Sequence, residues 1–396
     1  MNARSTHMSS IARSESESCF EDAASMNTST SCRPGKVVHV IGALAAGGAE
    51  RFVSELVPHF IKCGIDVALI ILSNRVDAVG SQMLLDLKRA GIKLHTGPTV
   101  KVGARTVLWY IHKLFEQKPS IVHLHTPNTE LAHYLATRFY RYPHRIYRTL
   151  HSVKPPDALA MRLAIRANKA AISIACGEAV YQAHRKVMSD RIITVENGVR
   201  FNWPIRTDEI SSAAKLKHGF KNNQFHFLIV GRMNHWNRQN SIKGHDTLID
   251  AWKRGKLGER DCILHIVGDG DLRQKLTTLA EGDNSIIFHG IQSNVHEWLL
   301  AADCFVMPSR YEGLPIAGIE AAGTGLPCVF SDIAPLRELK VPQVLWVPVG
   351  DPEALSHALS WVAMERPSVD TAEVNQFRKR FDIKDVAQRY AELYLR

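Results

Sequence analysis

Short apolar runs alternate with amphipathic stretches along this chain from Lys36 almost to its end. A run of about four to six apolar residues predicts a buried strand, and apolar residues three or four apart predict a helix. Regular alternation of the two is typical of a parallel sheet, because parallel strands need a helical crossover between them. In the first half we expect strands at Val37–Ile41, Val67–Leu72, Lys93–His95, Ile121–His125, Ile146–His151, Ala171–Ala175 and Ile192–Val195.

The alternation is interrupted after the turn dipeptide Asn197-Gly198 by an irregular stretch that reaches Trp203-Pro204. We therefore predict two Rossmann-like domains, residues 36–203 and 204–374, that face each other across a cleft. Ligands of such sheets bind at the carboxyl ends of the strands, so the active site is expected between the domains. In the second half we expect strands at Phe225–Val230, Ile263–Val267, Ile286–Phe288, Cys304–Met307, Pro327–Phe330 and Val344–Val347.

The composition is that of a globular protein, with 45% apolar and 22% charged residues. Residues 1–35 differ: they are rich in Ser and Thr and lack the apolar region of a secretory signal, and we expect a disordered extension. Seven scattered cysteines without metal-ligand spacing favour a cytoplasmic location. The longest aliphatic run, Val67–Leu72, is too short to cross the roughly 30 Å core of a bilayer.

Positive charge is concentrated between Lys101 and Lys169, where twelve Lys and Arg residues face three Asp and Glu. This segment is either an ordinary solvated face or a surface for an anionic membrane or a phosphate-bearing acceptor. No nucleic-acid-binding module is recognisable, so nucleic acid is not an expected partner.

Two glutamates, Glu312 and Glu320, follow the expected strand Cys304–Met307. If a helix begins near Pro315, the first lies in a loop and the second in the helix, and both carboxylates can accept hydrogen bonds from sugar hydroxyls in the cleft. The helix N-terminus between them offers free N–H groups and a partial positive charge that suit a diphosphate. The residues expected there are Gly313, Leu314 and Pro315.

Two cations follow the expected strand Phe225–Val230, namely Arg232 directly after it and Lys243 before the next helical stretch. Cations held at this strand end would stabilise negative charge on a bound ligand. The intervening segment Asn234–Ile242 holds another cation, Arg238. We favour Lys243 as the second cation and keep Arg238 as the alternative.

Glycines and histidines complete the candidate site. Gly47-Gly48 joins the first strand to a helix and lets the backbone approach a phosphate closely; it matches neither a dinucleotide-binding nor a Walker A loop. His125 and His151 end two strands that face the cleft, and we favour His125 over His151 as a site residue. Asp269-Gly270-Asp271 has the spacing of a metal-binding D-x-D motif, but its place at a strand-to-helix turn favours helix capping.

These motifs resemble those of the retaining glycosyltransferases of family 4, over nearly all of residues 36–396. The family's E-x₇-E motif matches Glu312, which by resemblance contacts the transferred sugar, and Glu320, which holds the ribose. An Arg and a Lys clamp the donor diphosphate in the family, which implies Arg232 and Lys243, although the loop before the lysine is longer here than usual. Gly-Gly-Ala-Glu-Arg resembles the family's first loop, and by resemblance His125 occupies the position beside the transferred sugar.

The resemblance implies a GT-B fold, with an N-terminal acceptor domain, a C-terminal donor domain and a terminal helix over residues 375–396 that returns to the first domain. It also implies retaining transfer from a nucleotide-diphosphate sugar, UDP-sugar before GDP-sugar, without cofactor or metal. The expected acceptor is a saccharide or a lipid-linked saccharide in surface polysaccharide synthesis, met at the cytoplasmic membrane face. The alternatives are a GT-B-fold epimerase or phosphorylase and a non-catalytic nucleotide-sugar-binding scaffold.

Overall fold

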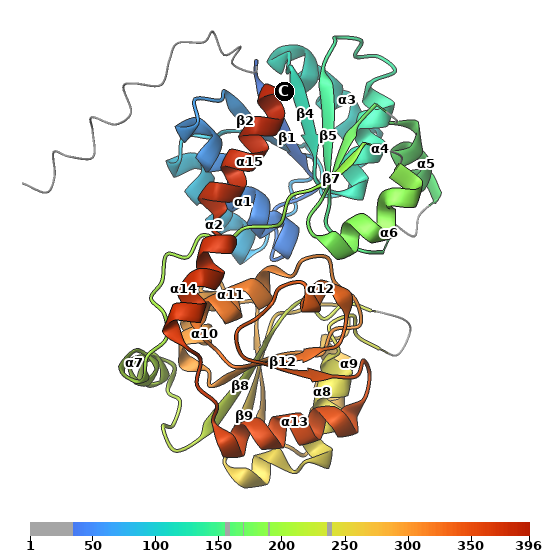
Figure 1. Cartoon of the computed structure of the whole chain (residues 1–396). Helices are drawn as coiled ribbons and strands as arrows, with labels where there is room; N and C mark the ends of the chain where they lie inside the picture. The colour runs from blue at the N-terminus through green and yellow to red at the C-terminus, as the bar shows by residue number, and fades with distance from the viewer. Residues whose placement is uncertain (1–34, 155–158, 169, 189–190, 236–239) are drawn as a thin grey trace, which may run out of the picture.

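The computed structural model describes residues 35–154, 159–168, 170–188, 191–235 and 240–396. It consists of two α/β domains stacked one above the other (Figure 1). Each domain is built on one parallel sheet flanked by helices, which confirms the predicted pair of Rossmann-like domains. The predicted N-terminal extension lies outside the described residues apart from Gly35.

The N-terminal sheet has seven strands in the order β3-β2-β1-β4-β5-β6-β7. The order reverses beside β1, so that the loops after β1 and β4 meet at one edge, where ligands of such sheets bind. The strands are β1 (Val37–Ile41), β2 (Val67–Ile71), β3 (Lys93–Thr96), β4 (Ile121–Leu124), β5 (Arg145–Leu150), β6 (Ile172–Ala175) and β7 (Ile192–Thr194). The helices are α1 (Gly48–Lys62), α2 (Ala78–Arg89), α3 (Ala104–Gln117), α4 (Pro127–Ala136), α5 (Leu159–Ala167) and α6 (Glu178–Met188).

The C-terminal sheet has six strands in the order β10-β9-β8-β11-β12-β13, with the same reversal beside β8. Its strands are β8 (Phe225–Val230), β9 (Cys262–Val267), β10 (Ile286–Gly290), β11 (Cys304–Met307), β12 (Cys328–Ser331) and β13 (Val344–Val347). Its helices are α7 (Asp208–His218), α8 (His245–Arg254), η1 (Leu257–Arg260), α9 (Arg273–Ala280), α10 (Val295–Ala301), α11 (Ile316–Thr324), α12 (Ala334–Arg337) and α13 (Pro352–Glu365). No helix in the described part of the chain is long and apolar enough to cross a bilayer.

The chain end predicted as one helix over residues 375–396 forms two helices, α14 (Thr371–Arg380) and α15 (Ile383–Leu395). The break has a local and a tertiary cause. Asp382 caps α15 by accepting the N–H of Lys384, and the Phe381 carbonyl accepts the N–H of Val199 in the interdomain linker. Helix α14 packs on α11 of the second domain, and α15 lies along α1 of the first (red in Figure 1).

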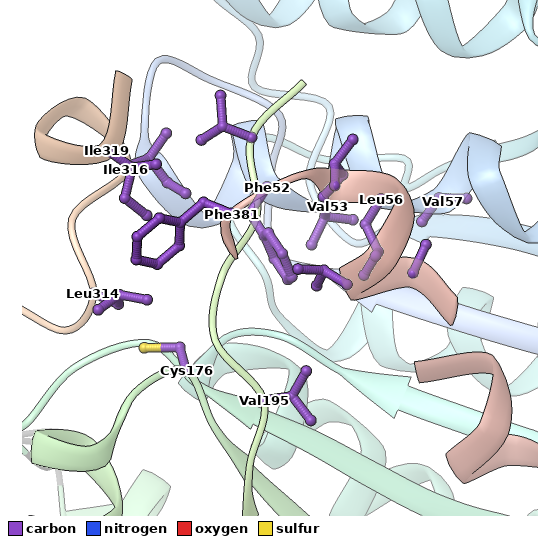
Figure 2. Packing of buried hydrophobic residues seen from close by; sticks show 14 of the residues in the cluster. Phe52, Val53, Leu56, Val57, Cys176, Val195, Leu314, Ile316, Ile319 and Phe381 are labelled. Carbon is purple, nitrogen blue, oxygen red and sulfur yellow. The ribbon is translucent and has the colours of Figure 1, made fainter. Parts of the chain in front are cut away.

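One apolar cluster runs through both domains (Figure 2). Phe52 and Leu56 of α1 contribute from the first domain, and Leu314 and Ile316 from the segment that leads into α11. Phe381, fully buried between the two terminal helices, belongs to the same cluster. Burial of a side chain of this size contributes about 1.5–3 kcal/mol, so this cluster is a substantial part of what holds the domains together.

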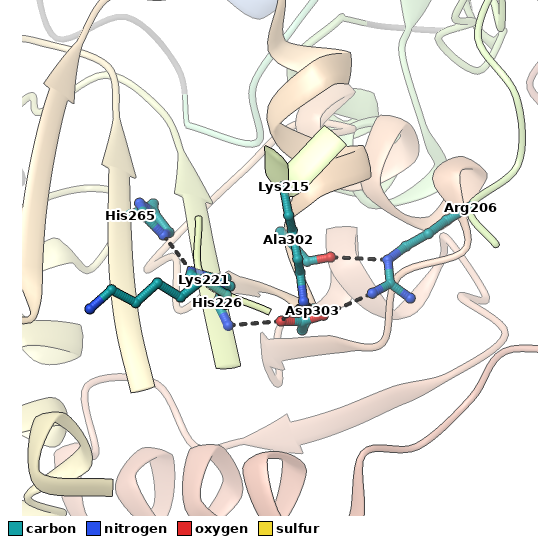
Figure 3. Close-up of polar contacts among 7 residues, drawn as sticks. All are labelled: Arg206, Lys215, Lys221, His226, His265, Ala302 and Asp303. Atoms are coloured by element: carbon teal, nitrogen blue, oxygen red, sulfur yellow. Dashed lines mark hydrogen bonds and ion pairs between the residues drawn. The ribbon is translucent and has the colours of Figure 1, made fainter. Parts of the chain in front are cut away.

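A second group of contacts fastens the linker and α7 to the C-terminal sheet (Figure 3). Asp303, directly before β11, accepts hydrogen bonds from Arg206 of the linker at 2.8 Å and from Lys215 of α7 at 2.7 Å. It also accepts the backbone N–H of His226 in β8. A partly buried carboxylate is costly to leave without its cationic partners, so replacing Arg206 or Lys215 would destabilise the attachment of these segments to the sheet.

Candidate active site

A cleft of about 960 Å³ lies between the domains. It is lined by residues that follow β1, β4 and β5 in the first domain and β8, β9 and β11 in the second, all at carboxyl ends of strands. This is where two facing Rossmann-like sheets are expected to bind a ligand. Of the predicted site residues, the lining includes Gly47, Gly48, His151, Arg232, Lys243, Glu312, Gly313, Leu314, Pro315 and Glu320.

Glu312 and Glu320 occupy the loop and the helix as predicted from their spacing, since α11 begins at Ile316. Glu312 lies in the loop after β11, and both its oxygens accept hydrogen bonds from the Lys243 ammonium, at 2.6 and 2.8 Å. Glu320 is buried in α11, where the guanidinium of Arg51 lies 3.2 Å from its Oε1. Burial raises the pKa of Glu320 to about 7, outweighing the attraction of Arg51.

Arg232 extends from the end of β8 across the cleft to the first turn of α1. Its Nη2 donates to Oε2 of Glu50 at 2.9 Å. A Cβ at Gly47 would overlap this guanidinium, so the absence of a side chain at this position lets the arginine lie directly on the turn. The glycine turn of one domain and the cation of the other therefore meet at one place, which suits a bound phosphate.

The segment that carries Lys243 is held by Arg310, which the sequence did not single out. Its guanidinium donates to the carboxylate of Asp246 at 2.7 and 2.9 Å and to the carbonyl of Ser241 at 2.5 Å. The N–H of Lys243 is bound in turn by the Ser241 hydroxyl. Lys243 is thus placed against Glu312 by a hydrogen-bonded loop. The alternative cation, Arg238, lies outside the described residues.

The two predicted histidines occupy different places. His151 lines the cleft, and its buried Nε2 has no hydrogen-bond partner among the described residues. His125 does not line the cleft but lies behind it, 1% exposed, with its Nε2 2.8 Å from Nδ1 of His39. Burial lowers the pKa of His151 to about 4 and that of His125 well below its usual value, so both rings are neutral at neutral pH.

His39, His123 and His125 are close enough together to suggest a metal centre. Their rings are nearly parallel, however, with interplanar angles of 12° to 27°. Metal ligands point in-plane lone pairs at one ion, and stacked rings do not converge in this way. His39 and His125 are hydrogen-bonded to each other, His123 is hydrogen-bonded to Tyr394 and Thr149, and Tyr394 also bonds His39. The cluster therefore joins α15 to the first sheet and does not fit a metal.

Several other residues line the cleft without having been predicted as site residues. Glu50 and Arg51 belong to the Gly-Gly-Ala-Glu-Arg segment, in which only the glycines were singled out. Asn197, predicted only as part of a turn, donates from Nδ2 to the carbonyl of Leu314 at 2.9 Å. Arg75 and Asp77 follow β2, where no motif marks them, and Asp77 accepts the N–H of Ala46.

Asp269 and Asp271 also line the cleft. Asp269 accepts the N–H of Gly270 at 2.7 Å, in a turn where a Cβ at Gly270 would overlap the backbone of Met233. The predicted helix capping is therefore wrong: the N-cap of α9 is Leu272, without a side-chain hydrogen bond, and Asp269 stabilises the turn before the helix instead.

Comparison with known proteins agrees with this geometry. Residues 46–203 match the family model described as Glycosyltransferase Family 4, and residues 224–364 match that described as Glycosyl transferases group 1. A putative glycosyltransferase of Bacillus subtilis, EpsF, is 28% identical over 75% of this chain and 79% of its own length.

Two further similarities concern a shorter region and the fold. An Escherichia coli UDP-Gal:alpha-D-GlcNAc-diphosphoundecaprenol alpha-1,3-galactosyltransferase is 34% identical over 29% of this chain and 30% of its own length. The structure of HepE from Anabaena with UDP and glucose superposes with a TM-score of 0.74 at 18% identity, over 91% of this chain and 99% of that one. The chain therefore belongs to glycosyltransferase family 4 and is a glycosyltransferase of the GT-B fold.

Proposed function

We propose that this enzyme transfers a hexose from UDP-sugar to a saccharide or lipid-linked saccharide acceptor, with retention of configuration and without a metal ion. The observation that carries the proposal is the arrangement around the cleft. Arg232 and Lys243 approach from the end of one sheet, the Gly47-Gly48 turn from the other, and Glu312 lies against the lysine. This set can hold a diphosphate and a sugar side by side.

The chemistry follows from what each group offers. Arg232 and Lys243 stabilise the charge on the departing nucleotide, which replaces the task that a metal ion performs in other transferases. The Glu312 carboxylate accepts hydrogen bonds from the sugar hydroxyls, and the neutral His151 ring accepts from or donates to one of them. We assign the sugar contact to His151, because it lines the cleft whereas His125 does not, and give His125 a supporting place behind it.

Retention is proposed through a same-face displacement. The acceptor hydroxyl attacks the anomeric carbon on the face that the phosphate leaves, and the departing phosphate oxygen takes the hydroxyl proton. This path requires the acceptor hydroxyl to be held close to the anomeric carbon of the donor, and a closed cleft between two domains can hold both substrates in this way.

A binding and activity test follows. Replacing Arg232 with Ala should reduce transfer by about a thousandfold, the usual effect of losing a charged group that stabilises the transition state. Arg254→Ala serves as a matched control, since Arg254 pairs with Asp250 on α8 outside the cleft lining. Wild-type turnover by the Arg232 variant would refute the assignment. Full activity in excess EDTA is the expected result for metal independence.

The donor is tested by thermal shift with UDP, GDP and ADP. UDP is favoured because the Anabaena neighbour was solved with UDP and glucose and the Escherichia coli relative is named for UDP-Gal. A ligand that binds only the folded state raises the melting temperature by mass action. Selective stabilisation by GDP or ADP would replace UDP as the donor nucleotide.

The acceptor side supports a lipid-linked substrate. Arg75 lines the cleft from the first domain and makes no ion pair within the part of the chain that the structure describes, so it is available to an anionic acceptor group such as a diphosphate. The Escherichia coli relative is named for an acceptor linked to diphosphoundecaprenol. A lipid-linked acceptor requires the enzyme to work at a membrane surface.

Helix α5 offers such a surface within the basic segment 101–169. Its residues Leu159, Arg162, Leu163 and Arg166 follow the i, i+3, i+4, i+7 pattern and are all exposed, and the two leucines are 68% and 53% exposed. Apolar and basic side chains on one exposed helix face suit the headgroup region of an anionic membrane.

Co-sedimentation with phosphatidylglycerol vesicles tests this membrane contact. Leu163→Glu should weaken binding severalfold. Leu216→Glu, at an 81% exposed position on α7 in the other domain, should bind like the wild type. Equal binding by both variants and the wild type would remove α5 from the proposal.

A further inference from the structure

We propose that Glu50 sets the affinity of the cleft for the donor by occupying, in the empty enzyme, the place of a donor phosphate beside Arg232. This inference rests on the proposed function, because it requires the donor diphosphate to bind at Arg232. It concerns a residue to which the proposed chemistry gives no other task.

The contact joins the two domains. Glu50 lies in the first turn of α1 in the N-terminal domain, and Arg232 follows β8 in the C-terminal domain. The carboxylate side chain is 13% exposed, whereas the guanidinium side chain is 45% exposed. Arg232 is therefore reachable from solvent while its carboxylate partner is largely covered.

The space that this pair fills is the space that a phosphate needs. A Cβ at Gly47 would overlap both Nη2 of Arg232 and Oε2 of Glu50, so the ion pair rests directly on the glycine turn. Helix α1 has no side-chain hydrogen bond at its N-cap. A phosphate that takes hydrogen bonds from this turn and from Arg232 must displace the carboxylate, and otherwise meets its negative charge at close range.

Glu50 differs in this respect from the two other carboxylates that pair with cations at the cleft. Glu312 pairs with Lys243 and Glu320 with Arg51, but both carboxylates have proposed contacts with the donor, to the sugar and to the ribose. Their release from a cation is balanced by a new hydrogen bond to the substrate. Glu50 gains no such contact, so its displacement lowers donor affinity without compensation.

Replacing Glu50 with Gln tests the inference. Gln is nearly isosteric and uncharged, so it gives up the competition for Arg232 while keeping the shape of α1. Partly exposed ion pairs contribute about 0.2–1 kcal/mol, which corresponds to a Kd for UDP that is up to about fivefold lower in E50Q than in the wild type. Isothermal titration calorimetry of the full chain measures this change. E116Q, a charge-matched change on exposed α3, should leave the Kd unchanged.

The same Glu50→Gln change in an R232Q variant separates the direct contact between Glu50 and Arg232 from the effect of removing a negative charge near the cleft. Because the competition acts through Arg232, E50Q should not improve UDP binding when Arg232 is also replaced by Gln. A gain that persists in R232Q would overturn the inference, as would unchanged or weaker UDP binding by E50Q. Both of these results leave the proposed function standing. Failure of the wild type to bind any of UDP, GDP and ADP would overturn the proposed function as well.

Discussion

Glu320 allows a test of whether a buried carboxyl that is proposed to bind the donor lowers the stability of the folded protein when it ionises. Its carboxyl is 5% exposed in α11, and burial raises its pKa from 4.5 to about 7. Between these two values the folded protein keeps a proton that the unfolded chain has lost. Stability contributed by this group is therefore present below pH 4.5 and is lost as the pH rises toward 7.

The size of the effect follows from the shift. This pKa shift lowers the free energy of unfolding by about 3 kcal/mol once the buried carboxylate is fully ionised, and by less than about 1 kcal/mol at pH 5. Glu320→Gln replaces the carboxyl with a group that does not titrate. Relative to the wild type, the variant should gain about 2–3 kcal/mol of unfolding free energy between pH 5 and pH 8.

Urea unfolding of both proteins at the two pH values measures this gain. An unchanged slope of free energy against urea shows that the same surface is exposed in each case. The variant should at the same time lose donor affinity, because the amide replaces the carboxylate proposed to hold the ribose. A stability difference that is equal at pH 5 and pH 8 would refute the reasoning, since Glu320 would then titrate alike in the folded and unfolded states.

Three further predictions follow from the structure. Gly313→Ala should hold the domains apart and reduce transfer, because the alanine methyl group would overlap the carbonyl of His151 in the other domain. Small-angle scattering should then show a larger radius of gyration, and an unchanged radius together with full activity would contradict this. His151→Ala should lower kcat while the Kd for UDP stays the same, and an equal loss in both would place the ring at the nucleotide instead. Acidification from pH 7 to pH 5 should lower the melting temperature, because burial lowers the pKa of His39 and His245 to about 3 from 6.5. The protein loses stability as the pH falls below 6.5, by about 2 kcal/mol for each of these two rings at pH 5, whereas Glu320 alone regains about 2 kcal/mol over this range. In the Glu320→Gln background, where that opposing effect is absent, a flat pH profile would show that the folded rings titrate like those of the unfolded chain.

Much of the fold was predictable because its determinants are local. The strand Phe225–Val230 is an uninterrupted apolar run, and the structure has β8 over the same residues. The spacing of Glu312 and Glu320 placed one carboxylate before α11 and the other within it, because a helix that begins near Pro315 leaves no other arrangement. The glycine pair predicted a backbone that a phosphate can approach closely, and in the structure the guanidinium of Arg232 from the other domain lies against Gly47.

The terminal helix shows where local pattern stops being sufficient. Apolar residues at helical spacing run through Phe377, Phe381 and Val386, and nothing in that spacing predicts a break. Two contacts accompany the break: Asp382 caps the start of α15 by accepting the N–H of Lys384, and the linker residue Val199 donates its N–H to the Phe381 carbonyl. The second partner is distant in the sequence, so the spacing of apolar residues along the helix could not reveal it.

The sequence by itself determined the two sheets, the cleft between them and the residue types that gather at its strand ends, because apolar runs, glycines and motif spacing act over short distances along the chain. Only the tertiary structure decided that His151 lines the cleft while His125 lies behind it, and that Glu50 and Arg51 pair with Arg232 and Glu320 of the opposite domain. Side-chain direction at a strand end and ion pairs across an interface depend on the packing of segments far apart in the chain, and no local pattern records that packing.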